Sequence, residues 1–158
     1  MRFPLSVARA VRAAVPREVP LGARITGSDW RDGGLTGDDA VAVAKALKGE
    51  GLDYVDVSSG GIAGDIRNPG DLGYNVAIAA RVKREAGIAT RTVGLIVQPA
   101  QAEEIVASGQ TDMVSLARAF LDDPHWGWHA ARALGADVPR PPQYLRAGPK
   151  LWAPTSAG

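Results

Sequence analysis

The feature that most constrains the fold is a regular alternation between helix-like and strand-like segments along the chain. Segments with apolar residues at helical spacing are followed by short apolar runs, and Gly, Pro, Asn or Asp marks most of the junctions. Thr36, with Asp39 three residues later, predicts a capping box at the start of one helix. Because a parallel crossover needs a helix to return the chain, this order predicts a parallel α/β sheet. The expected strands cover residues 20–26, 52–58, 89–96 and 111–117, and the expected helices cover residues 4–15, 39–51, 75–86, 99–109, 117–121 and 124–134.

Two segments of the chain share a similar spacing. Residues 50–58 and 108–116 both place a Gly shortly before an Asp and an apolar strand. A repeated βα unit would give this pattern in a barrel, but any connection from a helix through Gly to a strand would give it as well. Four βα units make half of an eight-stranded barrel, and an open doubly wound domain fits the same order. The alternation alone therefore leaves open both a complete small α/β domain and a part of a barrel.

Composition excludes several classes of function. Hydrophobic residues make up 46% of the chain and charged residues 22%, as in ordinary globular proteins. The formal net charge of +1 gives no electrostatic basis for binding nucleic acid or a membrane surface, and no apolar run approaches about 18 residues. The chain has no cysteine, which excludes disulfides, thiolate zinc sites and a Cys nucleophile and fits a reducing cytoplasm. The Arg-rich start, residues 1–20, fits an amphipathic helix better than a transit peptide, and His125 with His129 lacks a third ligand for a metal.

Small residues follow the expected strands at the point where each strand ends. Ligands collect at the carboxyl ends of parallel strands, and glycine or alanine there lets the backbone approach a ligand closely. The candidates are Ser58–Gly61, Gly94 with Leu95, and Ala117 with Arg118. Backbone N–H groups at such turns and the guanidinium of Arg118 favour an anion. Each glycine alone is equally an ordinary turn residue, but several strand ends of this kind together predict a phosphorylated ligand.

Arg24 lies inside the apolar strand expected at residues 20–26. A charged side chain there is costly unless it is paired or reaches a polar cavity. Alternate strand residues face the interior of a barrel. We therefore expect Arg24 to point toward the ligand or toward a buried acid such as Asp56.

The order of these segments resembles a known family. The residues that carry the resemblance are Arg24-Ile25 with Ser28-Asp29-Trp30, DYVDVSSGG at 53–61, TVGLI at 92–96, DMVSLARAFLDDPHW at 112–126 and PQYLRA at 142–147. Over nearly all of residues 1–147 the chain resembles the C-terminal half of Old Yellow Enzyme family flavoproteins, in particular the bacterial xenobiotic-reductase-like branch. The resemblance implies an α/β fold, the C-terminal half of a TIM (β/α)8 barrel, over residues 1–138, followed by a Pro-rich tail over residues 139–158.

The resemblance also implies a cofactor and a reaction. Members of the family bind FMN non-covalently at the carboxyl ends of the strands, take a hydride from NAD(P)H onto flavin N5 and pass it to an activated alkene or a quinone-like acceptor. By resemblance, Arg24 is the catalytic arginine near flavin N1 and O2, and Arg146 reaches into the site of a neighbouring subunit, which implies a homo-oligomer. The cofactor-binding residues implied in this way are Arg24, Ser59, Gly60, Gly94, Leu95, Ala117, Arg118 and Arg146.

Two departures from the family pattern bear on function. Ala117 stands where the family has Gly, so we expect its methyl group to weaken FMN binding while the backbone N–H remains. The first half of the barrel, with the residues that bind the substrate's activating group and the tyrosine proton donor, has no counterpart here, and Met1-Arg2-Phe3 matches an internal stretch of the family. We therefore expect a truncated gene or a start codon placed too late, and a chain that alone binds FMN weakly and turns over nothing. The alternatives are a half-barrel that dimerises into a flavin- or phosphate-binding module, and a small α/β interaction domain.

Overall fold

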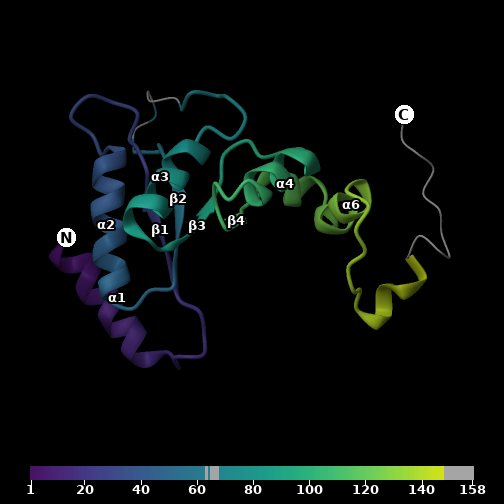
Figure 1. The fold of residues 1–158 in the computed structure, drawn as a ribbon, viewed down its shortest axis with the longest axis horizontal. Helices are drawn as coiled ribbons and strands as arrows, with labels where there is room; N and C mark the ends of the chain where they lie inside the picture. Colours follow the sequence, from purple (N-terminus) through teal and green to yellow (C-terminus); the bar gives the residue numbers. More distant parts are fainter. Residues whose placement is uncertain (63, 65–67, 148–158) are drawn as a thin grey trace. The chain divides into compact units, whose positions relative to one another are not determined.

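The computed structural model describes residues 1–62, 64 and 68–147 (Figure 1). The chain divides into two compact units, Met1–Pro124 and His125–Gly158. The second unit contains α6 (Trp126–Ala133) and a 3-10 helix, η1 (Pro142–Ala147). None of the helices in the described ranges is long and apolar enough to cross a bilayer.

The first unit is built on a sheet of parallel strands in the order β1-β2-β3-β4. The strands are β1 (Gly22–Thr26), β2 (Tyr54–Ser58), β3 (Ala89–Thr92) and β4 (Met113–Val114). The helices of this unit are α1 (Arg2–Ala14), α2 (Gly37–Gly49), α3 (Val76–Ala86), α4 (Pro99–Ala107) and α5 (Arg118–Asp122) (Figure 1). The predicted alternation is confirmed, and consecutive parallel strands that neighbour one another in chain order are the arrangement found along the wall of a (β/α) barrel.

Local sequence signals set the ends of two helices. The Thr36 hydroxyl accepts a hydrogen bond from the Asp39 N–H, and the Asp39 carboxylate accepts one from the Thr36 N–H at 2.8 Å. This confirms the predicted capping box, and the hydrogen bonds from Thr36 lower the pKa of the Asp39 carboxyl. At the C-terminal end of α3, Gly87 adopts a left-handed conformation with φ of 62°, which glycine reaches without a steric cost.

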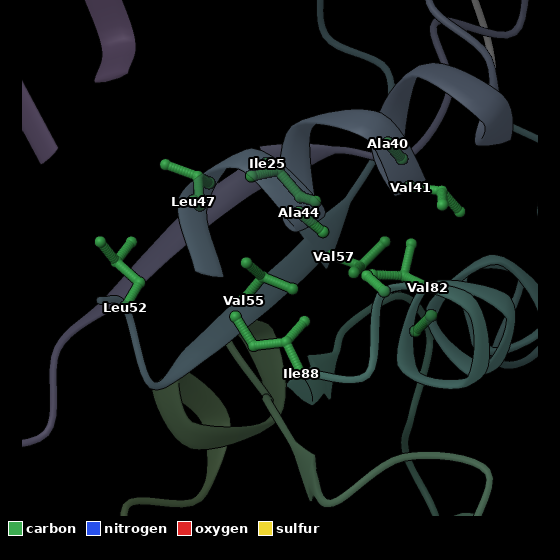
Figure 2. Close-up of a cluster of buried hydrophobic side chains, with 12 residues drawn as sticks. Ile25, Ala40, Val41, Ala44, Leu47, Leu52, Val55, Val57, Val82 and Ile88 are labelled. Carbon is green, nitrogen blue, oxygen red and sulfur yellow. The ribbon is translucent and has the colours of Figure 1, made fainter. Parts of the chain in front are cut away.

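The hydrophobic core lies between the sheet and the helices α2 and α3 (Figure 2). Val55 and Val57 of β2 are completely buried, and they belong to one cluster with Ala44 of α2 and Val82 of α3. Burial of a valine side chain of this kind stabilises the fold by about 1.5–3 kcal/mol. Since side chains alternate along a strand, Asp56, which lies between these two valines, points to the opposite face of the sheet.

The similarity between residues 50–58 and 108–116 has a structural basis in two aspartates. The Asp53 carboxylate accepts the Leu21 N–H at 2.8 Å, while the Asp53 N–H donates to the Leu21 carbonyl at 2.8 Å. Asp112 does the same to Thr90, with distances of 2.8 Å and 3.0 Å. Each aspartate therefore holds the beginning of the neighbouring strand, so the two helix-to-strand junctions are fixed by the same pair of hydrogen bonds.

The third and fourth strands are shorter than predicted. β3 ends at Thr92 and not at residue 96, and β4 spans only Met113–Val114. Beyond Thr92 the backbone is bound elsewhere, because the Asn75 side chain donates to the Val93 carbonyl at 2.8 Å. Gly94 then has φ of 123°, which takes the chain out of the extended conformation. The apolar residues continue from Val93 to Ile96 because the turn after β3 is itself partly buried.

Candidate functional site

A small pocket lies at the carboxyl ends of β3 and β4. Its volume is about 100 Å³, and its lining consists of Tyr74, residues 93–97 and residues 115–119. Two segments that are separated by residues 98–114 in the sequence thus meet where a parallel sheet commonly binds a ligand. The lining includes four predicted cofactor-binding residues, which are Gly94, Leu95, Ala117 and Arg118.

The Gly94–Leu95 turn has a backbone that few residues tolerate. Gly94 has φ of 123°, and Leu95 has φ of 50°, a left-handed conformation that is rare for a branched apolar residue. A Cβ added to Gly94 would lie 2.8 Å from the Tyr74 Cζ and 3.1 Å from the Asn75 Nδ2. The turn is therefore held in an unfavourable conformation by its neighbours, and such positions cluster at functional sites.

The same turn presents hydrogen-bond donors. The carbonyls of Gly94 and Leu95 are occupied, since the first accepts the Gly73 N–H at 2.9 Å and the second accepts the Gln101 amide at 3.2 Å. Within the described part of the chain, the N–H groups of Gly94 and Leu95 have no acceptor. A turn with occupied carbonyls and open N–H groups favours an anion over a cation.

Arg118 supplies the charge at this pocket. It is the first residue of α5, its side chain is exposed, and it forms no ion pair with any other described residue. Among the residues that the structure describes, no acidic side chain contributes to the lining. The guanidinium is therefore available for a bidentate contact with an oxyanion.

Ala117 does not need the conformational freedom of glycine. Its φ of −108° is open to any residue, and its N–H has no acceptor among the residues that the structure describes. The methyl group lies in the lining of the pocket and reduces its free volume. The expected effect of Ala117 on FMN is thus one of space rather than of backbone geometry, and it stays a prediction.

Arg24 lies on the face of the sheet opposite the core. Its guanidinium is 3.8 Å from the Asp56 carboxylate and donates to the Ser58 hydroxyl at 2.6 Å, while 63% of the side chain is exposed. The sequence offered two directions for this side chain, toward a ligand or toward Asp56. The structure gives Arg24 the Asp56 contact and leaves most of its donors uncovered, so the role near a flavin stays a prediction.

Ser59 and Gly60 connect two loops at the carboxyl ends of β1 and β2. The Ser59 hydroxyl accepts the Trp30 indole N–H at 2.7 Å, and the Gly60 N–H donates to the Ser28 carbonyl at 2.9 Å. Neither residue contributes to the pocket at β3 and β4. These two hydrogen bonds link the first residues after β2 to the residues after β1, and the contact of Ser59 and Gly60 with a flavin remains a prediction.

Arg146 belongs to the second unit. It lies in η1 and is exposed. The same unit contains a ring cluster in which His125 stacks on Trp128 with centroids 4.4 Å apart, and Tyr144 meets Trp128 at 5.1 Å. In the described residues no group of three or more acidic or histidine side chains could hold a metal ion. The predicted role of Arg146 in a neighbouring subunit stays a prediction.

Three residues that shape the pocket were not identified from the sequence. Tyr74 forms part of the wall, the Asn75 side chain is completely buried and binds the Val93 carbonyl, and Gln101 both donates to Leu95 and accepts the Val97 N–H at 3.0 Å. The sequence carried one usable signal, a polar Asn75 at the start of a helix with an otherwise apolar inner face. Gln101 gave none, because a glutamine on a surface helix is common.

Comparison with known proteins places these features in a family. The family described as NADH:flavin oxidoreductase / NADH oxidase matches residues 1–136. An NADPH dehydrogenase of Geobacillus sp. (strain WCH70) is 44% identical over 131 residues, which cover 80% of this chain and 37% of that protein. NADPH dehydrogenases of Bacillus velezensis and Listeria innocua are 41% and 38% identical over 128 residues, which in both cases cover 81% of this chain and 38% of the relative.

The chain thus spans 37–38% of the length of these relatives. The match extends over the whole sheet, the pocket at β3 and β4, and α6. The four parallel strands with their helices agree with part of the TIM barrel that this family adopts. The chain therefore belongs to the NADH:flavin oxidoreductase / NADH oxidase family, the Old Yellow Enzyme family expected from its sequence.

Proposed function

We propose that this chain supplies the FMN-binding part of an NADPH oxidoreductase of the ene-reductase type. The observation that carries the proposal is the pocket at the ends of β3 and β4. Its lining includes residues whose N–H groups have no acceptor, and an arginine without an ion pair, within the described part of the chain. An FMN phosphate fits this donor set, because it is a compact dianion that accepts several hydrogen bonds. The name shared by the relatives, NADPH dehydrogenase, supports NADPH as the co-substrate.

The proposed division of labour follows the sheet. The N–H groups of Gly94, Leu95 and Ala117 and the guanidinium of Arg118 bind the phosphate. Arg24 is the middle residue of β1, and its guanidinium reaches the Ser58 hydroxyl at the carboxyl end of β2. In this proposal it faces the pyrimidine edge of the flavin, where its positive charge stabilises negative charge at N1 and O2. When bound, FMN supplies hydride acceptance and donation at N5, between NAD(P)H and an activated alkene or quinone-like compound.

The 158-residue chain covers only part of this chemistry. By the family resemblance, the groups that bind the substrate's activating group and donate a proton match no position of this sequence. We therefore expect the isolated chain to bind FMN weakly and to leave alkenes unreduced. Binding, and not turnover, is the measurement that tests the proposal.

FMN and riboflavin distinguish the phosphate site from a general affinity for the isoalloxazine ring. Titration of the purified chain with each compound, followed by flavin fluorescence, should show tighter binding of FMN. Arg118→Ala should remove most of that preference and leave riboflavin binding unchanged. Equal affinity for the two compounds in the unmodified chain would remove the basis of the proposal.

A second candidate is a flavin- or phosphate-binding module made of two copies of the chain. β1 and β4 are the outer strands of the sheet in the described residues, and α1 leaves Phe3 and Val7 exposed at 76% and 44%. An apolar groove of about 480 Å³ runs between α1 and β1, with Leu5 and Val11 in its lining. Open strand edges beside an apolar face favour a further strand and helix there. Light scattering tests this candidate, since a monomer that binds FMN would leave no place for it.

A further inference from the structure

Three charged residues share one level of the sheet. Arg24 of β1 is paired in register with Asp56 of β2, and Asp56 is paired with Arg91 of β3. All three lie on the face opposite the valine core, because Val55 and Val57 on either side of Asp56 belong to that core. The level thus carries two positive charges and one negative charge in a row across neighbouring strands.

Both guanidiniums contact the same carboxylate oxygen. The Arg91 Nη2 donates to Asp56 Oδ2 at 3.3 Å, and the Arg24 Nη1 lies 3.8 Å from it. The other oxygen, Oδ1, is buried and has no hydrogen-bond partner among the described residues. Because only 4% of the Asp56 side chain is exposed, these two arginines provide its electrostatic compensation.

The two arginines differ in what else they contact. Arg91 packs its guanidinium over the Tyr54 ring, 5.3 Å from the centroid, and is 35% exposed. Arg24 is 63% exposed, and its second terminal nitrogen, Nη2, donates to the Ser58 hydroxyl. Arg91 is therefore the closer and better covered partner of Asp56, while the guanidinium of Arg24 is the more exposed one.

We infer that Arg91 offsets the charge of Asp56 and thereby keeps the charge of Arg24 available to the reduced flavin. Without Arg91, the carboxylate would face Arg24 alone, and the pair would be close to neutral. With Arg91, the three groups retain one net positive charge, and the exposed member is Arg24. Arg91 is then a positioning residue that acts through Asp56 and Arg24 on the affinity for reduced FMN. This inference rests on the proposed function, because it requires FMN beside Arg24.

The measurement is the ratio between the dissociation constants of oxidised and reduced FMN, determined by anaerobic titration of the purified chain. Arg91→Gln should weaken the binding of reduced FMN relative to oxidised FMN by about tenfold, which corresponds to a lowering of the two-electron potential by about 30 mV. Arg91→Lys should keep the ratio of the unmodified chain. Asp56→Asn in the Arg91→Gln background removes the carboxylate that would otherwise neutralise Arg24, and should restore the ratio of the unmodified chain.

Two further variants separate this effect from loss of structure and from net charge. Asp56→Asn alone leaves Ser58 to hold Arg24 and should shift the ratio in the opposite direction, toward reduced FMN. Arg84→Gln removes a positive charge from an exposed position on α3 and should leave the ratio unchanged. The inference is overturned, while FMN binding itself stands, if Arg91→Gln leaves the ratio unchanged. It is also overturned if the double variant still binds reduced FMN as weakly, relative to oxidised FMN, as Arg91→Gln does. A chain that binds no FMN in either redox state overturns the proposed function, and the inference with it.

Discussion

Replacement of Gly94 by alanine is the sharpest test of the turn that forms the pocket. The added Cβ would lie 2.8 Å from the Tyr74 Cζ and 3.1 Å from the Asn75 Nδ2. Neither neighbour can move away easily. The Tyr74 hydroxyl accepts a hydrogen bond from Asn68 at 3.0 Å and its ring packs edge-on to Trp30, while Asn75 is completely buried and bound to a backbone carbonyl.

The expected loss of stability combines two costs. A non-glycine residue at φ of 123° is strained by about 1–3 kcal/mol, and overpacking in a tight site costs about 1–3 kcal/mol. We therefore expect Gly94→Ala to lower the free energy of unfolding by about 2–6 kcal/mol and to weaken FMN binding, because the displaced turn no longer aims its N–H groups at the phosphate.

Urea unfolding followed by tryptophan fluorescence measures this loss, with Gly109→Ala as the matched control. Gly109 also has a positive φ, 76°, but a Cβ there would meet no atom within 4 Å. The control should therefore lose only the conformational part. Tyr74→Leu in the Gly94→Ala background should return part of the difference, because it removes the ring that the methyl group meets. If Gly94→Ala costs no more than Gly109→Ala, close packing against Tyr74 does not fix this turn.

Three other predictions address the phosphate contact, a helix end and a strand end. Arg118→Ala should weaken FMN binding by about 1.5–3 kcal/mol, measured by fluorescence titration, because a charge-assisted hydrogen bond is lost; retention of full affinity would exclude Arg118 from the phosphate site. Thr36→Ala should lower the free energy of unfolding by about 1 kcal/mol in the same urea assay, since the capping box of α2 is removed, and a loss below a few tenths would contradict its role. Burial raises the pKa of Asp112, but hydrogen bonds from the Thr90 N–H and the Lys83 ammonium outweigh it and hold the pKa below the ordinary value of 3.8. The folded form thus binds this proton less well than the unfolded form, so the Asp112 carboxylate stabilises the fold above pH 3.8, and this contribution is lost as the pH falls through the lowered pKa. Asp112→Asn should therefore lower the free energy of unfolding at pH 7, and the difference from the unmodified chain should shrink below pH 4. Parallel curves of unfolding free energy against pH for the two proteins would show that the carboxylate is unimportant.

The helices and the alternation of helices and strands along the chain could be predicted because their signals are local. Apolar spacing, the Thr36–Asp39 pair and the glycine at position 87 each act within a few residues along the chain. The lengths of β3 and β4 could not be predicted in this way. β3 ends where the Asn75 side chain takes the Val93 carbonyl, and these two residues are eighteen positions apart. A periodic apolar pattern contains no information about such a contact.

For the candidate site, the residues at strand ends could be predicted, and the residues that support them could not. Gly94, Leu95, Ala117 and Arg118 were identified because each lies at the end of an expected strand, and the structure brings all four into one pocket. The residues that hold the pocket in shape, Tyr74 and Gln101, were not identified, since they reach it from helices and loops whose packing the sequence does not specify. Arg91 was missed for a related reason. Its importance depends on the register between β2 and β3, which places it beside Asp56.

The two faces of the sheet carry different kinds of side chain. On β2 the completely buried valines at 55 and 57 point to the helices, and the alternate positions carry Asp56 and Ser58, which contact charged groups on the other face. A strand of five residues can do both because its side chains alternate. The cost of placing a carboxylate in the middle of a sheet is met by arginines from the strands on either side, which is possible only where three parallel strands are in register. The same arrangement leaves an arginine of the outer strand partly uncompensated and exposed, and the proposed role of Arg24 beside an anionic reduced flavin depends on this property.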